Sequence, residues 1–263
     1  MLVVTENLTI PHQQSEPFYG RPNWAARTTA VHPKQEETYP EAVDARPPLF
    51  SGILPQDYSR VAAAARVKEF ARGDMLFVGG DTVQQVLLLT SGFAKISQFG
   101  LNGTEVILRL SSPGDVLGAT GLFTTGHHYT TCEAFRACRA LVWDALTFKT
   151  LISRYPLLHQ NMVRILSEDL LELQERFREV ATERVAPRVA RQLVRLLKRI
   201  GRSVNGAVEV SLTREELAQM TGTTLFTVSR LLSSWEARGV VLPRREGVTI
   251  CNVQALRAIA EED

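Results

Sequence analysis

The sequence predicts an α+β protein built, in chain order, from an antiparallel β-domain, one long helix and a winged helix-turn-helix. Three observations support this prediction. Short β-rich runs recur at intervals of about ten residues between positions 50 and 148, with no helical pattern between them. A stripe of apolar residues with heptad spacing follows between positions 157 and 184. A capped helix, a glycine turn and a second helix then lie between positions 213 and 239.

The first 49 residues give no signal for packed structure. They hold seven of the 12 prolines of the chain and show no sustained hydrophobic period. Frequent X-Pro steps and few clustered apolar side chains are typical of a poorly ordered segment. We therefore expect residues 1–49 to form a disordered, proline-rich leader.

Residues 50–155 are expected to form the β-domain. The dipeptide Asn102-Gly103 between two β-rich runs is the strongest hairpin signal, because a tight primed turn needs positive φ. Regularly spaced strands without helices between them indicate an antiparallel sandwich or barrel. The β-rich runs are Met75–Val78, Val86–Leu89, Phe93–Ile96 and Val106–Leu110.

Residues 156–184 are expected to form a dimerisation helix. Positions from His159 to Arg184 are separated alternately by four and three residues, which is the spacing of a coiled-coil seam. A helix that packs only on its own domain usually carries a broader and shorter apolar stripe, so this pattern favours pairing with a second copy. The inner positions of the seam are Val163, Leu166, Leu170, Leu173, Phe177 and Val180.

The C-terminal part, residues 185–263, is expected to be a winged helix-turn-helix that binds DNA. Thr213 and Glu216 form an S/T-x-x-E capping box, which starts a short helix. Gly222 is a turn residue that tolerates a left-handed backbone, and Thr224 caps a second helix. Two short helices joined in this way form a helix-turn-helix, whose second helix enters the major groove of DNA.

The candidate DNA contacts lie on the second helix and on a predicted two-stranded wing. An arginine at the start of this helix can fork onto a guanine edge, and apolar side chains suit thymine methyl groups. Other residues lie where a helix N-terminus points at the phosphate backbone. The expected DNA-binding residues are Arg214, Thr224, Leu225, Phe226, Thr227, Ser229 and Arg230, with Arg244 and Arg245 at the tip of the wing.

The charge distribution also points to nucleic acid. The net charge of the chain is only +2, but residues 184–245 carry 12 basic and four acidic side chains. Three widely spaced cysteines indicate reduced thiols rather than a metal or disulfide motif. No apolar run is long enough for a membrane helix, and the N-terminus lacks the pattern of a secretion signal. We therefore expect a cytoplasmic protein with no membrane partner.

From Phe50 to its end, the chain resembles the Crp/Fnr family of transcription regulators. The run Gly114–Phe123 is similar to the family's phosphate-binding cassette, and glycines stand where the family's β-roll turns place them. The resemblance implies a β-roll sensor, a homodimer on an inverted-repeat operator in double-stranded DNA, and a contact with RNA polymerase. A signal at the β-roll would shift the dimer helices and so the spacing of the two DNA-binding heads.

The effector pocket implied by this resemblance comprises Gly118, Ala119, Tyr129 and Thr130, and it departs from a cyclic-nucleotide site. A cyclic-nucleotide binder of the family has Glu where Ala119 stands and an Arg-Ser or Arg-Thr pair where Tyr129-Thr130 stands. Burial of a phosphate anion without a charged partner is costly, so we expect a signal other than cyclic AMP. No cysteine precedes Cys132, so the family's N-terminal iron–sulfur cluster is not expected.

The recognition helix departs from the family as well. Phe226 replaces the family's Glu, while Ser229 and Arg230 persist, so the base that the Glu would read is expected to change. The stretch Gln219–Arg230 resembles the subgroup that regulates nitrite and nitric oxide reduction. This resemblance implies nitric oxide as a candidate signal and haem as a candidate cofactor. The candidate haem ligands by location are His127, His128 and His159.

Two alternative functions remain open at the sequence level. Phe226 is compatible with a small-molecule-sensing signalling module in which DNA binding is weak or vestigial. An enzyme built on the β-domain, such as a cupin-type metal enzyme, would need a spaced His-x-His and a further carboxylate. His127 and His128 are adjacent and point to opposite faces in an extended chain, and no activated nucleophile pair is evident. We therefore do not expect an enzyme.

Overall fold

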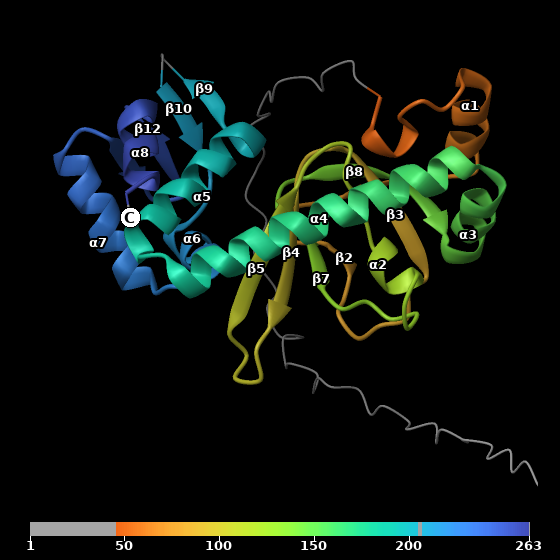
Figure 1. The fold of residues 1–263 in the computed structure, drawn as a ribbon, viewed down its shortest axis with the longest axis horizontal. Helices are drawn as coiled ribbons and strands as arrows, with labels where there is room; N and C mark the ends of the chain where they lie inside the picture. The colour runs from red at the N-terminus through yellow and green to blue at the C-terminus, as the bar shows by residue number, and fades with distance from the viewer. Residues whose placement is uncertain (1–45, 205–206, 263) are drawn as a thin grey trace, which may run out of the picture.

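The structure is a computed structural model that describes residues 46–204 and 207–262 (Figure 1). Most of the predicted leader, residues 1–45, lies outside the described residues. The boundary predicted at residue 49 is too late, because Pro48–Phe50 form a short 3-10 helix, η1, in which Leu49 and Phe50 are fully buried. The packed part of the chain therefore begins before residue 50.

Two four-stranded antiparallel sheets form the N-terminal domain, which confirms the predicted β-roll. Each sheet combines strands from distant parts of the sequence, as expected when a chain winds between two layers. The first sheet has the order β1 (Arg66–Phe70), β8 (Cys138–Asp144), β3 (Gln85–Ser91) and β6 (Val116–Leu117). The second has the order β2 (Met75–Phe77), β7 (Thr131–Ala134), β4 (Ala94–Phe99) and β5 (Glu105–Ser111).

Alternating apolar residues from both sheets fill the space between them, including Leu87, Ile96 and Ala134. A second apolar cluster lies at one end of the β-roll, beneath α1 (Pro55–Ala63) and α3 (Ala145–Arg154). Trp143 is fully buried in this cluster, and its indole N–H donates to the carbonyl of Val61 at 2.8 Å. Because a buried indole N–H must be paired, this bond fixes α1 on the sheet.

The long helix α4 (Pro156–Thr182) crosses the molecule from α3 to the C-terminal domain (Figure 1). Its first turns bury Leu158 and Met162 against the β-roll, and the amide of Asn161 donates to the carbonyls of Leu49 and Ser51 at 3.0 and 2.8 Å. The rest of the helix leaves a row of large apolar side chains exposed. The structure therefore packs only part of the apolar surface that the sequence places on this helix.

A cluster of charged residues joins α4 to α5 (Val185–Ile200). Glu179 is only 2% exposed, and its carboxylate pairs with Arg191 at 3.5 Å and with Arg195, whose Nη1 donates at 2.8 Å. The buried guanidinium of Arg188 donates to the carbonyl of Thr221 at 2.8 Å and to that of Glu183 at 3.2 Å. These bonds fix the angle between the two helices, because each buried charge requires its partners in one geometry.

The C-terminal domain is a winged helix-turn-helix, as predicted. Its four-stranded antiparallel sheet packs with the helices around a core that includes Leu193, Leu217 and Trp235. Beyond α5, its elements are β9 (Arg202–Val204), β10 (Ala207–Val210), α6 (Arg214–Thr221), α7 (Leu225–Ala237), β11 (Val241–Arg244), β12 (Gly247–Ile250) and α8 (Val253–Ala260).

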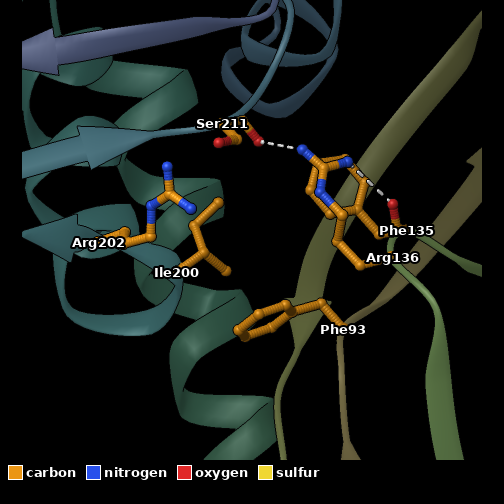
Figure 2. Close-up of a pocket in the computed structure, with 6 residues that line it drawn as sticks. All are labelled: Phe93, Phe135, Arg136, Ile200, Arg202 and Ser211. Carbon is orange, nitrogen blue, oxygen red and sulfur yellow. Dashed lines mark hydrogen bonds between the residues drawn. The ribbon is translucent and has the colours of Figure 1, made fainter. Parts of the chain in front are cut away.

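The C-terminal domain is docked directly onto the β-roll. Ile107 and Leu110 of β5, together with Phe135, belong to the same buried apolar cluster as the helix-turn-helix core. Figure 2 shows part of the contact between the two domains, where the guanidinium of Arg136 donates to the carbonyl of Ser211 at 3.1 Å. No sequence pattern indicates this contact, because each domain satisfies its own periodicity.

The buried carboxylate at the α4–α5 joint provides a test of this arrangement. We expect Glu179→Gln to lower the free energy of unfolding by roughly 2 kcal/mol, because it leaves two arginines without their shared counter-charge. The measurement is denaturant unfolding of the full chain. The matched control is Glu175→Gln on the same helix, which removes an exposed carboxylate and should leave the midpoint unchanged. Equal midpoints for both variants would contradict a structural role of the joint.

Candidate DNA interface and ligand cavity

The turn between α6 and α7 has the local geometry that its sequence predicts. The Thr213 hydroxyl accepts the backbone N–H of Glu216 at 3.1 Å, and the Glu216 carboxylate accepts the N–H of Thr213 at 2.6 Å. Gly222 ends α6 with φ +58° and ψ 44°, a left-handed conformation that glycine adopts without strain. The Thr224 hydroxyl accepts the N–H of Thr227 at 3.2 Å and so caps α7. Caps and glycine together fix the angle between the helices.

The helix α7 presents an apolar head to solvent. Val228, Leu232 and Trp235 are buried and attach it to the domain core. Leu225 and Phe226 at its first turn are 44% and 84% exposed. Two large apolar side chains in water, at the start of a helix whose other face is anchored, favour a binding surface.

The remaining predicted contact residues surround this head. α7 packs on both α6 and β11, so the turn, the helix and the wing form one surface. Arg230 is exposed and Ser229 is half-buried on α7, while Arg244 and Arg245 are exposed at the turn between β11 and β12. Arg214 at the start of α6 is half-buried, and its Nε has no hydrogen-bond partner among the described residues.

A cavity of about 340 Å³ lies between the β-roll and α4. All four predicted effector residues line it: Gly118, Ala119, Tyr129 and Thr130. Gly118 has φ +81° and caps the short helix α2 (Ala119–Leu122), and a Cβ there would lie 3.2 Å from the carbonyl oxygen of Gln85. The cassette therefore bends at a position that only glycine fills without displacing its neighbours.

The charged residues in the wall of this cavity are not among those predicted from the sequence. Arg109 of β5 forms an ion pair with Asp169 of α4, and both residues line the cavity. Glu172 and Arg176 of α4 line it as well. The spacing of Leu166, Asp169, Leu173 and Arg176 is a helical-face signal that could have indicated these residues. This signal overlaps the heptad stripe, because Leu166 and Leu173 belong to both patterns.

Two of these cavity residues also bond to the C-terminal domain. Arg176 donates to the carbonyl of Met220, in α6, at 2.9 Å and to that of Ile107 at 3.4 Å. Glu172 pairs with Arg199 of α5 at 3.3 Å. The cavity wall and the helix-turn-helix are thus connected through single side chains.

His128 is a neutral group in the cavity wall. Its ring stacks on that of Phe77, with centroids 4.1 Å apart and planes 10° apart. Burial lowers the pKa of His128 to about 4, against the opposing effect of Asp81, and His127 lowers it further. At neutral pH the ring is therefore an uncharged, largely apolar surface.

Family models match both halves of the chain. The model described as "Cyclic nucleotide-binding domain" matches residues 67–155, and that described as "Crp-like helix-turn-helix domain" matches residues 187–259. Together they cover more than half of the sequence, and they occur in the order in which the β-roll and the helix-turn-helix follow one another. The chain belongs to the Crp/Fnr family. Crp/Fnr proteins are transcription regulators with a DNA-binding helix-turn-helix and a sensor domain of the cyclic-nucleotide-binding type.

Curated relatives in the Crp/Fnr family span most of the chain. The chain is 27% identical over 214 residues to the "CRP-like cAMP-activated global transcriptional regulator" of Mycobacterium tuberculosis, covering 81% of the chain and 96% of that protein. It is 28% identical over 194 residues to the "Cyclic AMP receptor protein" of Thermus thermophilus, covering 74% and 88%. It is 25% identical over 197 residues to the "Fumarate and nitrate reduction regulatory protein" of Escherichia coli, covering 74% and 78%.

Solved structures of Crp/Fnr type share the fold. The regulator CLP of Xanthomonas campestris superposes with a TM-score of 0.68 at 20% identity, covering 74% of this chain and 98% of that one. A CooA variant of Carboxydothermus hydrogenoformans superposes with a TM-score of 0.65 at 22% identity, covering 83% and 97%.

Among the described residues, no helix combines the length and apolarity needed to cross a bilayer.

The three histidines suggested as haem ligands are not gathered at one site. His127 is exposed on its loop, His159 is exposed on α4, and only His128 lines the cavity. The His128 ring is stacked on Phe77, and the carboxylates of Asp169 and Glu172 would repel haem propionates. The described cavity residues therefore do not fit a haem group, and no cluster of three or more metal-ligating side chains occurs among the residues that the structure describes.

The lowered pKa of His128 predicts a specific loss of stability in acid. Below pH 6.5 the unfolded chain binds a proton that the folded His128 refuses until the pH approaches 4, so stability falls across this window. We expect His128→Phe, which keeps a ring against Phe77, to abolish a loss on the order of 1–2 kcal/mol between pH 6.5 and 4. The measurement is denaturant unfolding at stepped pH.

The matched control is His127→Phe, the same substitution at the adjacent exposed position. It should leave most of the acid loss in place, because burial of His128, and not its neighbour His127, is the largest cause of the lowered pKa. If the wild type and His128→Phe lose stability in parallel, His128 is not held neutral by burial.

Proposed function

We propose that this Crp/Fnr regulator acts as a homodimer on an inverted-repeat operator and is controlled by a small molecule in the β-roll cavity. The observation that supports this proposal most directly is the pair of exposed apolar surfaces, the α7 head and the α4 stripe. In a soluble chain such surfaces are normally covered by a partner. DNA fits the first surface, which arginines surround, and a second copy of the chain fits the other.

The head of α7 is proposed to read base edges in the major groove. Arg230 projects from the exposed face and suits a guanine, while Ser229 suits a base or phosphate. Leu225 and Phe226 suit thymine methyl groups. Phosphate contacts position a recognition helix on DNA without reading the base sequence. The residues proposed to make these contacts are Arg214, Thr224, Thr227, Arg244 and Arg245.

The exposed stripe of α4 is proposed to pair with its copy. Five of its six seam residues are about half or more exposed. The sixth, Leu166, is half-buried and packs on the apolar cluster beneath α1 and α3. The helix is long enough for a coiled-coil seam of several heptads, and burial of these side chains would remove a large apolar area from water. The exposed side chains are Val163 (51%), Leu170 (54%), Leu173 (48%), Phe177 (74%) and Val180 (49%).

Further assignments follow from the family and from the recognition helix. The stretch Gln219–Arg230 supports membership of the subgroup that regulates nitrite and nitric oxide reduction. We also propose that residues 50–155 act as the sensor, 156–184 as the dimerisation helix and 185–263 as the DNA-binding domain. The protein would act in the cytoplasm, contact RNA polymerase and catalyse no reaction of its own.

The dimer proposal predicts the effect of charges on α4. We expect Phe177→Asp and Leu170→Asp to convert the protein from dimer to monomer at micromolar concentration, because each places a carboxylate in an apolar seam. Analytical ultracentrifugation measures the outcome. Leu146→Asp, at an 80% exposed position on α3, is the matched control and should remain dimeric. A wild-type monomer, or dimers of both α4 variants, would refute the seam.

The DNA proposal predicts how Phe226 reads its operator. Operators are first selected from random duplexes with the full-length protein, and binding is then measured by fluorescence anisotropy. Replacing the contacted thymine by uracil removes one methyl group and should weaken wild-type binding about fourfold, from roughly 0.8 kcal/mol per buried carbon. Phe226→Ala should bind more weakly and lose this sensitivity to the methyl group.

Arg245→Gln is the contrasting variant for this experiment. It should weaken binding to the thymine and uracil operators equally and lower the salt dependence by about one unit of slope, as for a lost phosphate contact. Absence of any salt-sensitive sequence preference in the wild type would favour the alternative function, a signalling module with vestigial DNA binding.

A further inference from the structure

We propose that the ligand of the β-roll cavity is an uncharged, largely apolar small molecule. This inference rests on the proposed function in one respect, because it takes the cavity as the site where the controlling small molecule binds. It goes beyond that function by naming the chemical class that the cavity walls select. Three features of the walls support it.

The first feature is that both arginines of the cavity already have partners within the protein. Arg109 is paired with Asp169 across the cavity wall. Arg176 donates to the carbonyls of Met220 and Ile107. An anionic ligand would have to displace a partner from one of these arginines, and would leave a half-buried carboxylate or a backbone carbonyl unsatisfied.

The second feature is a pair of carboxylates, which balances the two arginines of the cavity and leaves no net positive charge to attract an anion. Asp169 and Glu172 are both on the wall that α4 contributes. Burial raises the pKa of Asp169, against the opposing effect of Arg109, because water solvates its charged form poorly there. A second anion within a few ångströms would meet like-charge repulsion in a medium of low dielectric.

The third feature is the apolar floor and sides. Ile96, Leu108 and Leu117 line the cavity from the strands, and Leu166 and Leu173 line it from α4. Ala119 adds a methyl group rather than a polar group, and the stacked pair of Phe77 and His128 adds a neutral aromatic surface. At about 340 Å³ the cavity has the size of a small-molecule site, and its walls offer mainly hydrophobic contact.

A matched pair of probes tests the ligand class directly on the full-length protein. N-phenyl-1-naphthylamine is neutral, and 8-anilino-1-naphthalenesulfonate has the same aromatic skeleton with one added anionic group. We expect the neutral probe to bind saturably and at least tenfold more tightly than the anionic probe. Cyclic AMP, the third probe, should not displace the neutral one at millimolar concentration. Tighter binding of either anion would overturn the proposal, and so would failure of the neutral probe to bind.

Two variants locate the probe and test the charge argument. Leu108→Trp fills the cavity from β5 and should weaken binding of the neutral probe at least tenfold, whereas Leu146→Trp, exposed on α3, should not. Asp169→Asn removes the partner of Arg109 and should shift the affinity ratio at least tenfold toward the anionic probe. Thermal unfolding is recorded for each variant, so that a misfolded protein is not counted as one that fails to bind.

Operator binding is measured on the same samples, which separates this inference from the proposed function. If DNA binding persists while the neutral probe fails to bind, or binds without sensitivity to Leu108→Trp, the ligand class is wrong and the regulator remains. If operator binding is absent from the wild type, the proposed function itself fails.

Discussion

The helix α4 contacts the β-roll, the cavity and solvent along its length, and the rest of the structure depends on which of its faces meets each of them. Its first turns bury Leu158 and Met162 against the β-roll. A mixed face, with Asp169 and Arg176 beside Leu166 and Leu173, closes the cavity. The apolar stripe that includes Phe177 remains in solvent. Because the helix is a rigid rod with 3.6 residues per turn, rotation or sliding that serves one face moves the others as well. The proposed ligand binding, the proposed subunit pairing and the position of the C-terminal domain are thus physically linked.

The charged residues of the cavity make that link short. Glu172 reaches Arg199 on α5, and Arg176 reaches the backbone of α6 at Met220. These bonds lie between packed elements where the effective dielectric is low, so rearranging one of them changes the free energy of docking between the domains. A small molecule that alters the cavity wall therefore needs no extended pathway to bias the helix-turn-helix. The same residues explain why the cavity suits an uncharged ligand, because their charges already have partners.

The recognition helix shows a comparable division between scaffold and contact surface. The caps at Thr213 and Thr224, the glycine turn and the buried anchor at Trp235 fix where α7 begins and how it is oriented. Its first turn then presents Phe226 almost completely to water. An apolar head on a rigid helix recognises methyl groups and groove shape through contact area, whereas a carboxylate at the same position recognises a hydrogen-bond donor. With Phe226 in place of the family's Glu, the proposed base contact therefore changes while the position of α7 does not.

Local patterns in the sequence were enough to determine the α+β fold class, the long helix, the capping box, the left-handed Gly222 and the exposed head of α7. Each of these depends on residues a few positions apart, whose periodicity and backbone preferences are written directly in the chain. The four predicted pocket residues also line the cavity, since the cassette that holds them is a local turn. Only the tertiary structure decided the charged wall of Arg109 and Asp169 and the docking of the C-terminal domain on β5. These contacts join residues about 60 or more positions apart, and a pairwise charge or apolar match at that separation has no period that a sequence pattern can reveal.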